Sequence, residues 1–169
     1  MSRQFRRVAG AQIVALGGLL LVASTACAQE REEPDTSEIP AQVMDGLMAR
    51  FPAAEIDEWT MEEEGEIVVY DIEFNQEGRK FEADIREDGS IHNWEQAIAA
   101  DDLPAAVETA ANARYAGASM TEVMAVTTVT ADGEALEGYE IVFRTADDEV
   151  AEILVAPDGE ILEDEGQGD

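Results

Sequence analysis

The fold is decided by one short stretch, Val68-Val69-Tyr70-Asp71-Ile72-Glu73-Phe74, in which large apolar residues alternate with mostly acidic ones. Side chains of a β-strand point alternately to its two faces, so this pattern predicts one buried and one largely solvated face. Residues 81–86 (FEADIR) alternate in the same way. The pair Asp88-Gly89 that follows is typical of a hairpin turn, because glycine readily takes a positive φ. With an earlier strand expected at residues 56–61, these patterns predict an antiparallel meander.

A helix is expected just before these strands. Its apolar residues recur at helical spacing and make one face: Val43, Met44, Leu47, Met48 and Phe51. Pro40 suits the first turn of a helix, where the missing N–H would have had no partner. Pro52 disfavours helical backbone at the residue before it, so the helix should end at Phe51.

The same order of motifs occurs a second time along the chain. The matching segments are residues 39–43 (IPAQV) with 103–107 (LPAAV), 49–51 (ARF) with 113–115 (ARY), 70–74 (YDIEF) with 139–143 (YEIVF), and 88–91 (DGSI) with 158–161 (DGEI). Matches that keep their order indicate a duplication. They predict an α+β fold of two tandem repeats, residues 39–98 and residues 101–163. Each repeat would be an N-terminal helix packed on its own antiparallel β-meander, with Asp102 as the N-cap of the second helix.

The two predicted sheets differ on their outward faces. The first carries only acids there: Asp71, Glu73, Glu82 and Asp84. The corresponding positions of the second are Glu140, Val142, Glu152 and Leu154, with Val150 nearby. A half-apolar outer face is expected to be covered, either by the other repeat or by another subunit.

The amino-terminal segment has the pattern of a secretory signal peptide. Residues 1–28 begin with three arginines, continue with an apolar stretch over residues 8–22 and end in Ala26-Cys27-Ala28. The alternative, a retained membrane anchor, would need ~20 apolar residues. A second alternative is lipidation of Cys27, because Ser24-Thr25-Ala26-Cys27 partly resembles a lipobox. The chain is therefore expected to be exported to the periplasm or cell envelope, with a flexible acidic tether at residues 29–38 and a disordered tail at residues 164–169.

Charge excludes several functions. The 169 residues include 10 Lys and Arg against 39 Asp and Glu, a net charge of -29. Such a surface repels nucleic acid and anionic lipid, and it attracts basic proteins and cations. One cysteine excludes a disulfide scaffold and any multi-thiolate metal site.

No catalytic motif is evident. His92 is the only histidine, and the serines Ser37, Ser90 and Ser119 lack a nucleophile-elbow context. His92 is therefore interpreted as a surface strand residue, and the chain as a non-enzyme without a cofactor.

A cation site is a weaker alternative. The candidates are the loop carboxylates of residues 62–64 (EEE) and of Asp147, Asp148 and Glu149, because Ca²⁺ takes several oxygen ligands. The Asp-Gly pairs lack the acidic ladder of an EF-hand. Solvated loops that keep strand edges from pairing are the simpler interpretation.

The motifs listed for the duplication resemble those of the PepSY-like family, which includes envelope domains grouped as β-lactamase-inhibitor-like. The resembling features are Leu/Ile-Pro-Ala-x-Val, an aromatic residue ending the helix, Tyr-x-Ile-x-Phe and a closing Asp-Gly-x-Ile. The resemblance covers nearly the whole mature chain as two copies. It implies a secreted, non-enzymatic module whose relatives bind or restrain other proteins, peptidases and β-lactamases among them. The extreme acidity of this chain departs from typical members.

We therefore expect an exported binding module, with binding of Ca²⁺ or other cations as the alternative. The partner should be another envelope protein of basic character, not nucleic acid, and membrane contact should occur only through lipid on Cys27. The chain itself is expected to be a monomer or a homodimer. The candidate partner-binding residues are Trp94, His92, Val142, Val150 and Leu154. Trp59 is expected in the core.

Overall fold

The computed structural model describes residues 34–64 and 67–166. The expected signal peptide, Cys27 and the first half of the expected tether lie outside these residues. The elements, in chain order, are α1 (Ala41–Arg50), β1 (Glu55–Glu64), β2 (Ile67–Gln76), β3 (Arg79–Arg86), β4 (Ile91–Ala97), η1 (Ala100–Asp102), α2 (Ala105–Arg114), β5 (Ser119–Thr130), β6 (Gly133–Arg144), β7 (Val150–Val155) and β8 (Ile161–Asp164). Among the described helices, none has the length and apolar character needed to cross a membrane.

All eight strands belong to one antiparallel sheet, in the order β1-β2-β3-β4-β5-β6-β7-β8. The prediction of two helix-plus-meander repeats, each with its own sheet, is wrong. β4 pairs directly with β5, from Asn93 opposite Thr128 to Ala97 opposite Met124. The physical reason is that a free strand edge presents unpaired N–H and C=O groups, and these two edges satisfy each other. Alternation along a strand identifies its two faces but not its neighbour.

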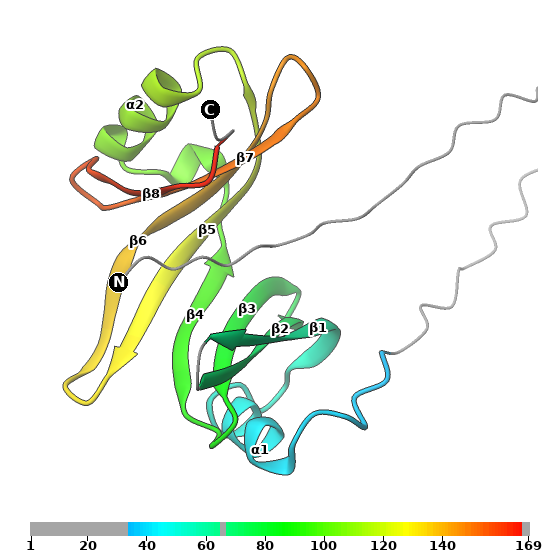
Figure 1. Cartoon of the computed structure of the whole chain (residues 1–169). Coiled ribbons are helices and arrows are strands. Elements are labelled where there is room, and N and C mark those ends of the chain that lie inside the picture. Colours follow the sequence, from blue (N-terminus) through cyan, green and yellow to red (C-terminus); the bar gives the residue numbers. More distant parts are fainter. Residues whose placement is uncertain (1–33, 65–66, 167–169) are drawn as a thin grey trace, which may run out of the picture. The chain divides into compact units, whose positions relative to one another are not determined.

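Both helices lie on the same face of this sheet. Residues directly opposite each other in neighbouring strands point to the same side, and Trp94 of β4 lies opposite Thr127 of β5. Trp94 packs against Phe51 at the end of α1. Val123, on the same side of β5 as Thr127, belongs to the core that includes residues of α2. We call this side the helix face. The opposite side, which no described helix covers, is called the helix-free face (Figure 1).

Two apolar clusters fill the helix face. Val43 and Leu47 of α1, both with no exposed surface, pack with strands β2 and β3. The ring of Phe51 lies 4.8 Å from that of Phe74 between centroids. Under α2 the fully buried residues include Val107, Ala111, Ile141 and Phe143. The apolar face predicted for the first helix is therefore the one that packs on the sheet.

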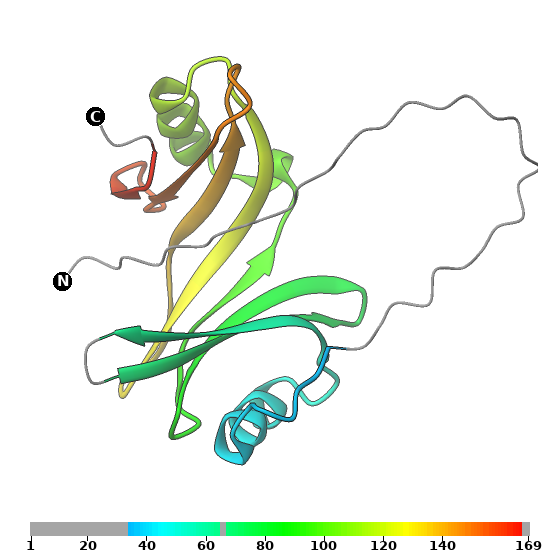
Figure 2. The same cartoon turned by 45° about the vertical axis from the view of Figure 1, so that its right-hand side comes forward.

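The long β5–β6 hairpin curves strongly (Figure 2) and contains register shifts in its pairing. One shift lies between Val126 and Thr127, where two residues of β6 oppose one of β5. Such a bulge bends a strand and increases its twist. Gly138 lies at this bend, and a Cβ there would stand 2.5 Å from the carbonyl oxygen of Val155. The bend therefore requires glycine at this position.

Each of the two helices begins directly after a proline and has no side-chain cap. α1 begins after Pro40 and its last helical residue is Arg50, with Phe51 as the C-cap, where the helix was predicted to end. The prediction that Asp102 caps the second helix is wrong, because Asp102 belongs to η1 and Pro104 occupies the N-cap position of α2. Neither Pro40 nor Pro104 makes a side-chain cap hydrogen bond. Leu103, which lies between η1 and Pro104, is buried. The start of α2 is therefore preceded by the 3₁₀ turn η1 and the buried side chain of Leu103, where a polar N-cap was expected.

Candidate binding face

The helix-free face combines an apolar floor with a high density of acids. Val69, Met124, Val126 and Leu154 are buried there, from strands β2, β5 and β7. The acids that share the face by strand register are Asp71, Glu73, Glu82, Asp84, Glu95, Glu122, Glu140 and Glu152. Glu82 and Glu95 are themselves buried, with 2% and 5% of their surface exposed. Carboxylates this dense set a strongly negative potential over the face.

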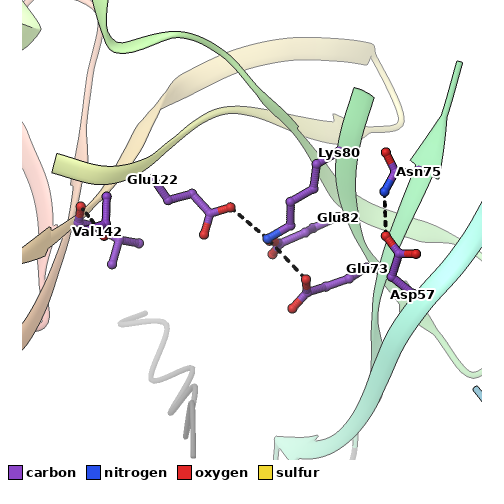
Figure 3. A network of polar contacts seen from close by, with 8 residues as sticks. Asp57, Glu73, Asn75, Lys80, Glu82, Glu122 and Val142 are labelled. Atoms are coloured by element: carbon purple, nitrogen blue, oxygen red, sulfur yellow. Dashed lines mark hydrogen bonds and ion pairs between the residues drawn. The ribbon is translucent and has the colours of Figure 1, made fainter. Parts of the chain in front are cut away.

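Lys80 is the cation at the centre of the acids contributed by β2, β3 and β5 (Figure 3). Its Nζ lies 2.8 Å from Glu122, 3.0 Å from Glu82 and 3.2 Å from Glu73. Burial alone would lower the pKa of Lys80, but the hydrogen bonds and charges of Glu122 and Glu82 outweigh it and raise that pKa above its usual value. The side chain therefore stays charged. Next to this network, Asn75 donates a hydrogen bond of 2.6 Å to Asp57.

Three of the five residues predicted to bind a partner lie on the helix-free face. Val142 of β6 is half-buried there, opposite Glu152 of β7. Leu154 belongs to the floor, and Val150 is 57% exposed. Register places these side chains on one side of neighbouring strands, as the outward-face comparison predicted.

Trp94 and His92 lie elsewhere. Trp94 is on the helix face, 5.9 Å from Phe51 between ring centroids, and the guanidinium of Arg50 lies over its ring. His92 lies at a register shift between β3 and β4. Arg86 donates to its Nδ1 at 2.7 Å, so this nitrogen accepts in the arrangement seen. Trp59, expected in the core, packs at the edge of the α1 cluster and donates a hydrogen bond to the Asp35 carbonyl oxygen.

Of the acids considered for a cation, residues 62–64 belong to strand β1 and not to a loop, so that expectation is wrong, whereas Asp148 and Glu149 make local contacts in a turn. Arg144 donates to Asp148 at 2.9 Å in the turn between β6 and β7. The hydroxyl of Thr145 accepts from the Glu149 amide in the same turn. In the part of the chain that the structure describes, no group of three or more His, Cys, Asp or Glu side chains is placed to hold a metal ion.

A second ion pair joins α1 to the β5–β6 hairpin on the helix face. Arg50 donates from Nε to Glu134 Oε1 at 3.1 Å and from an Nη to Oε2 at 3.2 Å. The hydrogen bond from Arg50 holds the pKa of the Glu134 carboxyl below its usual value. Sequence reasoning did not single out this pair or the Lys80 network. The one available signal was that Lys80 is the only lysine in the chain.

An open hollow of about 240 Å³ lies where β4 leads into η1 beside the start of β5. Glu122 is the one ionisable side chain among the described residues that line it; the others include Ile98, Met120 and Thr121. The Glu122 carboxylate makes an ion pair with Lys80, whose Nζ lies 2.8 Å away, and so belongs to the network described above.

Comparison with known proteins identifies the fold but not a family. No family model matches the sequence, and no curated protein matches it. Among solved structures, a DUF2874 family protein from Bacteroides uniformis is 21% identical, with a TM-score of 0.56 over 74% of this chain and 87% of that one. A "putative periplasmic" protein from Bacteroides eggerthii is 20% identical, with a TM-score of 0.57 over 74% and 86% of the two chains.

A BLIP-like protein from Bacteroides fragilis is also similar, at 19% identity and a TM-score of 0.50 over 77% of this chain and 89% of that one. The chain therefore has a BLIP-like fold. At these identities the likeness concerns the fold alone.

Proposed function

We propose that this protein is an exported, non-enzymatic module that binds a basic protein in the periplasm or cell envelope through its helix-free face. The observation that carries the proposal is that this face combines buried apolar residues from β2, β5 and β7 with at least eight carboxylates. Val150 of β7 is 57% exposed on this face, and exposed apolar surface rimmed by polar residues is typical of protein-binding sites. Its negative charge favours a positively charged partner and disfavours acidic ones.

Three further features support the proposal. The leader pattern of residues 1–28 favours export. One structural neighbour is described as periplasmic and another as BLIP-like. The PepSY-like resemblance points to a module that restrains other envelope proteins. Each agrees with a binding role, and none supplies a catalytic group.

The test is retention of envelope proteins on the immobilised chain, with charge-matched variants. Glu140→Gln with Glu152→Gln removes two charges from the helix-free face. Glu108→Gln with Glu160→Gln removes the same charge from exposed positions on α2 and on the turn before β8. We expect wild type and the second variant to retain the same protein, and the first to bind it about tenfold more weakly. Equal retention by both variants would contradict the assignment of the face.

The same purified protein also tests the alternative function, binding of Ca²⁺ or other cations. A partner bound through charge should dissociate progressively as NaCl rises, because salt screens interactions between exposed charges. A calcium titration by calorimetry should give only a weak, salt-like signal. Saturable, stoichiometric heat together with an absence of any retained protein would favour a cation-binding role instead.

A further inference from the structure

The sheet has a seam between β4 and β5, where the two half-sheets β1–β4 and β5–β8 meet. β4 and β5 pair over five positions, from Asn93 to Ala97. β3 and β4 also pair over five positions, and β5 and β6 over eleven, so the length of the ladder does not by itself distinguish the seam. α1 packs on β3 and α2 on β7, so each of these contacts stays within its own half-sheet. The angle between the two sides of the seam therefore rests mainly on the β4–β5 pairing and on the side chains that cross it.

Lys80 crosses this seam on the helix-free face. It belongs to β3, and it holds Glu73 and Glu82 within its own half-sheet (Figure 3). Its third partner, Glu122, belongs to β5, on the far side of β4. The side chains of Lys80 and Glu122 are 33% and 32% exposed, so solvent and salt reach them. This contact therefore resists separation of β3 from β5 on that face.

Arg50 crosses the seam on the opposite, helix face. It extends from the last turn of α1 and forms its two hydrogen bonds with Glu134 in β6, 84 positions later. Its guanidinium lies 5.0 Å from the ring centre of Phe51 and 5.1 Å from that of Trp94. A planar guanidinium held by aromatic faces and by a two-point carboxylate contact has one preferred direction.

We propose that Lys80–Glu122 and Arg50–Glu134 form a pair of clasps, on opposite faces of the sheet, that fix the angle between the two half-sheets. A single contact on one face opposes bending in one direction only, whereas contacts on both faces oppose it in both. The angle sets how far apart the two sides of the helix-free face lie. Because both clasps are partly exposed ion pairs, ionic strength controls how firmly the angle is held. The inference concerns the shape of that face and does not depend on a partner binding there.

The direct readout is the distance between the two helices. Spin labels at Asp45→Cys in α1 and Asn112→Cys in α2 occupy exposed positions on different half-sheets; the chain also carries Cys27→Ser. Glu122→Gln breaks the part of the Lys80 network that crosses the seam. Glu73→Gln is its control, because it removes the same charge from the same lysine within one half-sheet. Glu134→Gln breaks the other clasp, with Asp148→Asn as the control for an ion pair within one half-sheet.

We expect Glu122→Gln and Glu134→Gln each to broaden the distance distribution, and the two controls to leave it unchanged. The parent chain should broaden in the same way as NaCl is raised to about 1 M, where the Debye length falls to about 3 Å. This salt series needs no clasp variant, so it tests the proposal even if a variant fails to fold. A distribution that is equally narrow in all variants and at all salt concentrations would overturn the proposal, as would equal broadening by the controls.

Lys80 supplies a second readout, because it is the only lysine in the chain. Its acylation by an amine-selective reagent can be followed by peptide mass, separately from the terminal amine. We expect Glu122→Gln to raise the acylation rate about threefold, since the lost contact is one partly exposed ion pair. Glu134→Gln, which does not touch Lys80, should raise it through opening of the seam. A rate that is unchanged in Glu134→Gln while the distance distribution also stays narrow would show that the clasps do not act together.

Discussion

Gly46 of α1 lies directly against Gly89 of the β3–β4 turn, backbone on backbone. A Cβ on Gly46 would stand 2.1 Å from the Gly89 carbonyl oxygen, and a Cβ on Gly89 would stand 2.3 Å from the Gln42 carbonyl oxygen. Gly89 also has a φ of 84°, which the Asp-Gly turn requires. This close contact between the two backbones sets how near α1 can lie to its half of the sheet.

Gly46→Ala should therefore destabilise the fold, although alanine is the better helix former by about 1 kcal/mol. The methyl group would push α1 away from the turn, and we expect a net loss of about 2 kcal/mol. Thermal and urea unfolding followed by circular dichroism measure it. Asp45→Ala, at an exposed position of the same helix, should be neutral or slightly stabilising. If both variants unfolded alike, the close approach would not limit the packing.

The Tyr115 hydroxyl should lose its proton at a higher pH than an ordinary tyrosine. Burial of its ring, followed by its hydrogen bond and charge interaction with Asp164, raises the pKa of the Tyr115 hydroxyl to about 12. The unfolded chain loses this proton near pH 10, so stability should fall as pH rises between about 10 and 12. The difference between the ultraviolet titrations of wild type and Tyr115→Phe isolates this residue. Asp164→Asn should bring the midpoint back toward 10, and a wild-type midpoint already at 10 would contradict the model of the site.

Loss of Lys80 should cost more than a surface ion pair. Lys80→Met removes the ion pair between Lys80 and Glu82, whose side chain is 2% exposed. Breaking a buried pair costs about 3–5 kcal/mol; because Lys80 is one-third exposed, we expect about 2 kcal/mol. Lys80→Met combined with Glu82→Gln should recover part of the loss, because the buried charge is removed as well. No recovery in the double variant would show that the cost arises from packing of the lysine stem.

Stability should pass through a maximum as pH falls. Thirty-nine acids against ten basic residues repel one another, so raising NaCl or lowering pH from 7 to about 5 should raise the melting temperature. Below about pH 4 the trend should reverse. Burial alone would raise the pKa of Asp164, but hydrogen bonds from Tyr115 and Arg114 outweigh it and hold that pKa below its usual value. The hydrogen bond from Arg50 likewise lowers the pKa of Glu134. Stability from such carboxylates is lost as pH falls through the folded-state pKa. A melting temperature that is independent of salt and pH would contradict this balance.

The sequence was most informative where the signal is local. Alternation in residues 68–74 and 81–86 correctly placed β2 and β3, and the apolar spacing up to Phe51 placed α1 and its end. The outward-face comparison also placed Val142, Val150 and Leu154 together. Each of these follows from neighbours a few residues apart.

Contacts between distant residues could not be predicted. Pairing of β4 with β5 joins segments more than twenty residues apart through main-chain groups that every residue carries. The Lys80–Glu122 and Arg50–Glu134 pairs join positions 42 and 84 residues apart, in a chain where acids are everywhere and no single one stands out. Trp94 was a candidate partner-binding residue, whereas its ring packs against Phe51 and under the guanidinium of Arg50.

The central claim, that the helix-free face is the binding face, is tested most directly by site-specific photo-crosslinking in the native host. A photoreactive residue replaces Val150, which is 57% exposed on that face, or Glu108, which is exposed on α2. We predict one discrete protein adduct from position 150, weakened by salt, and none from position 108. The same adduct from both positions, or an adduct from position 108 alone, would contradict the account.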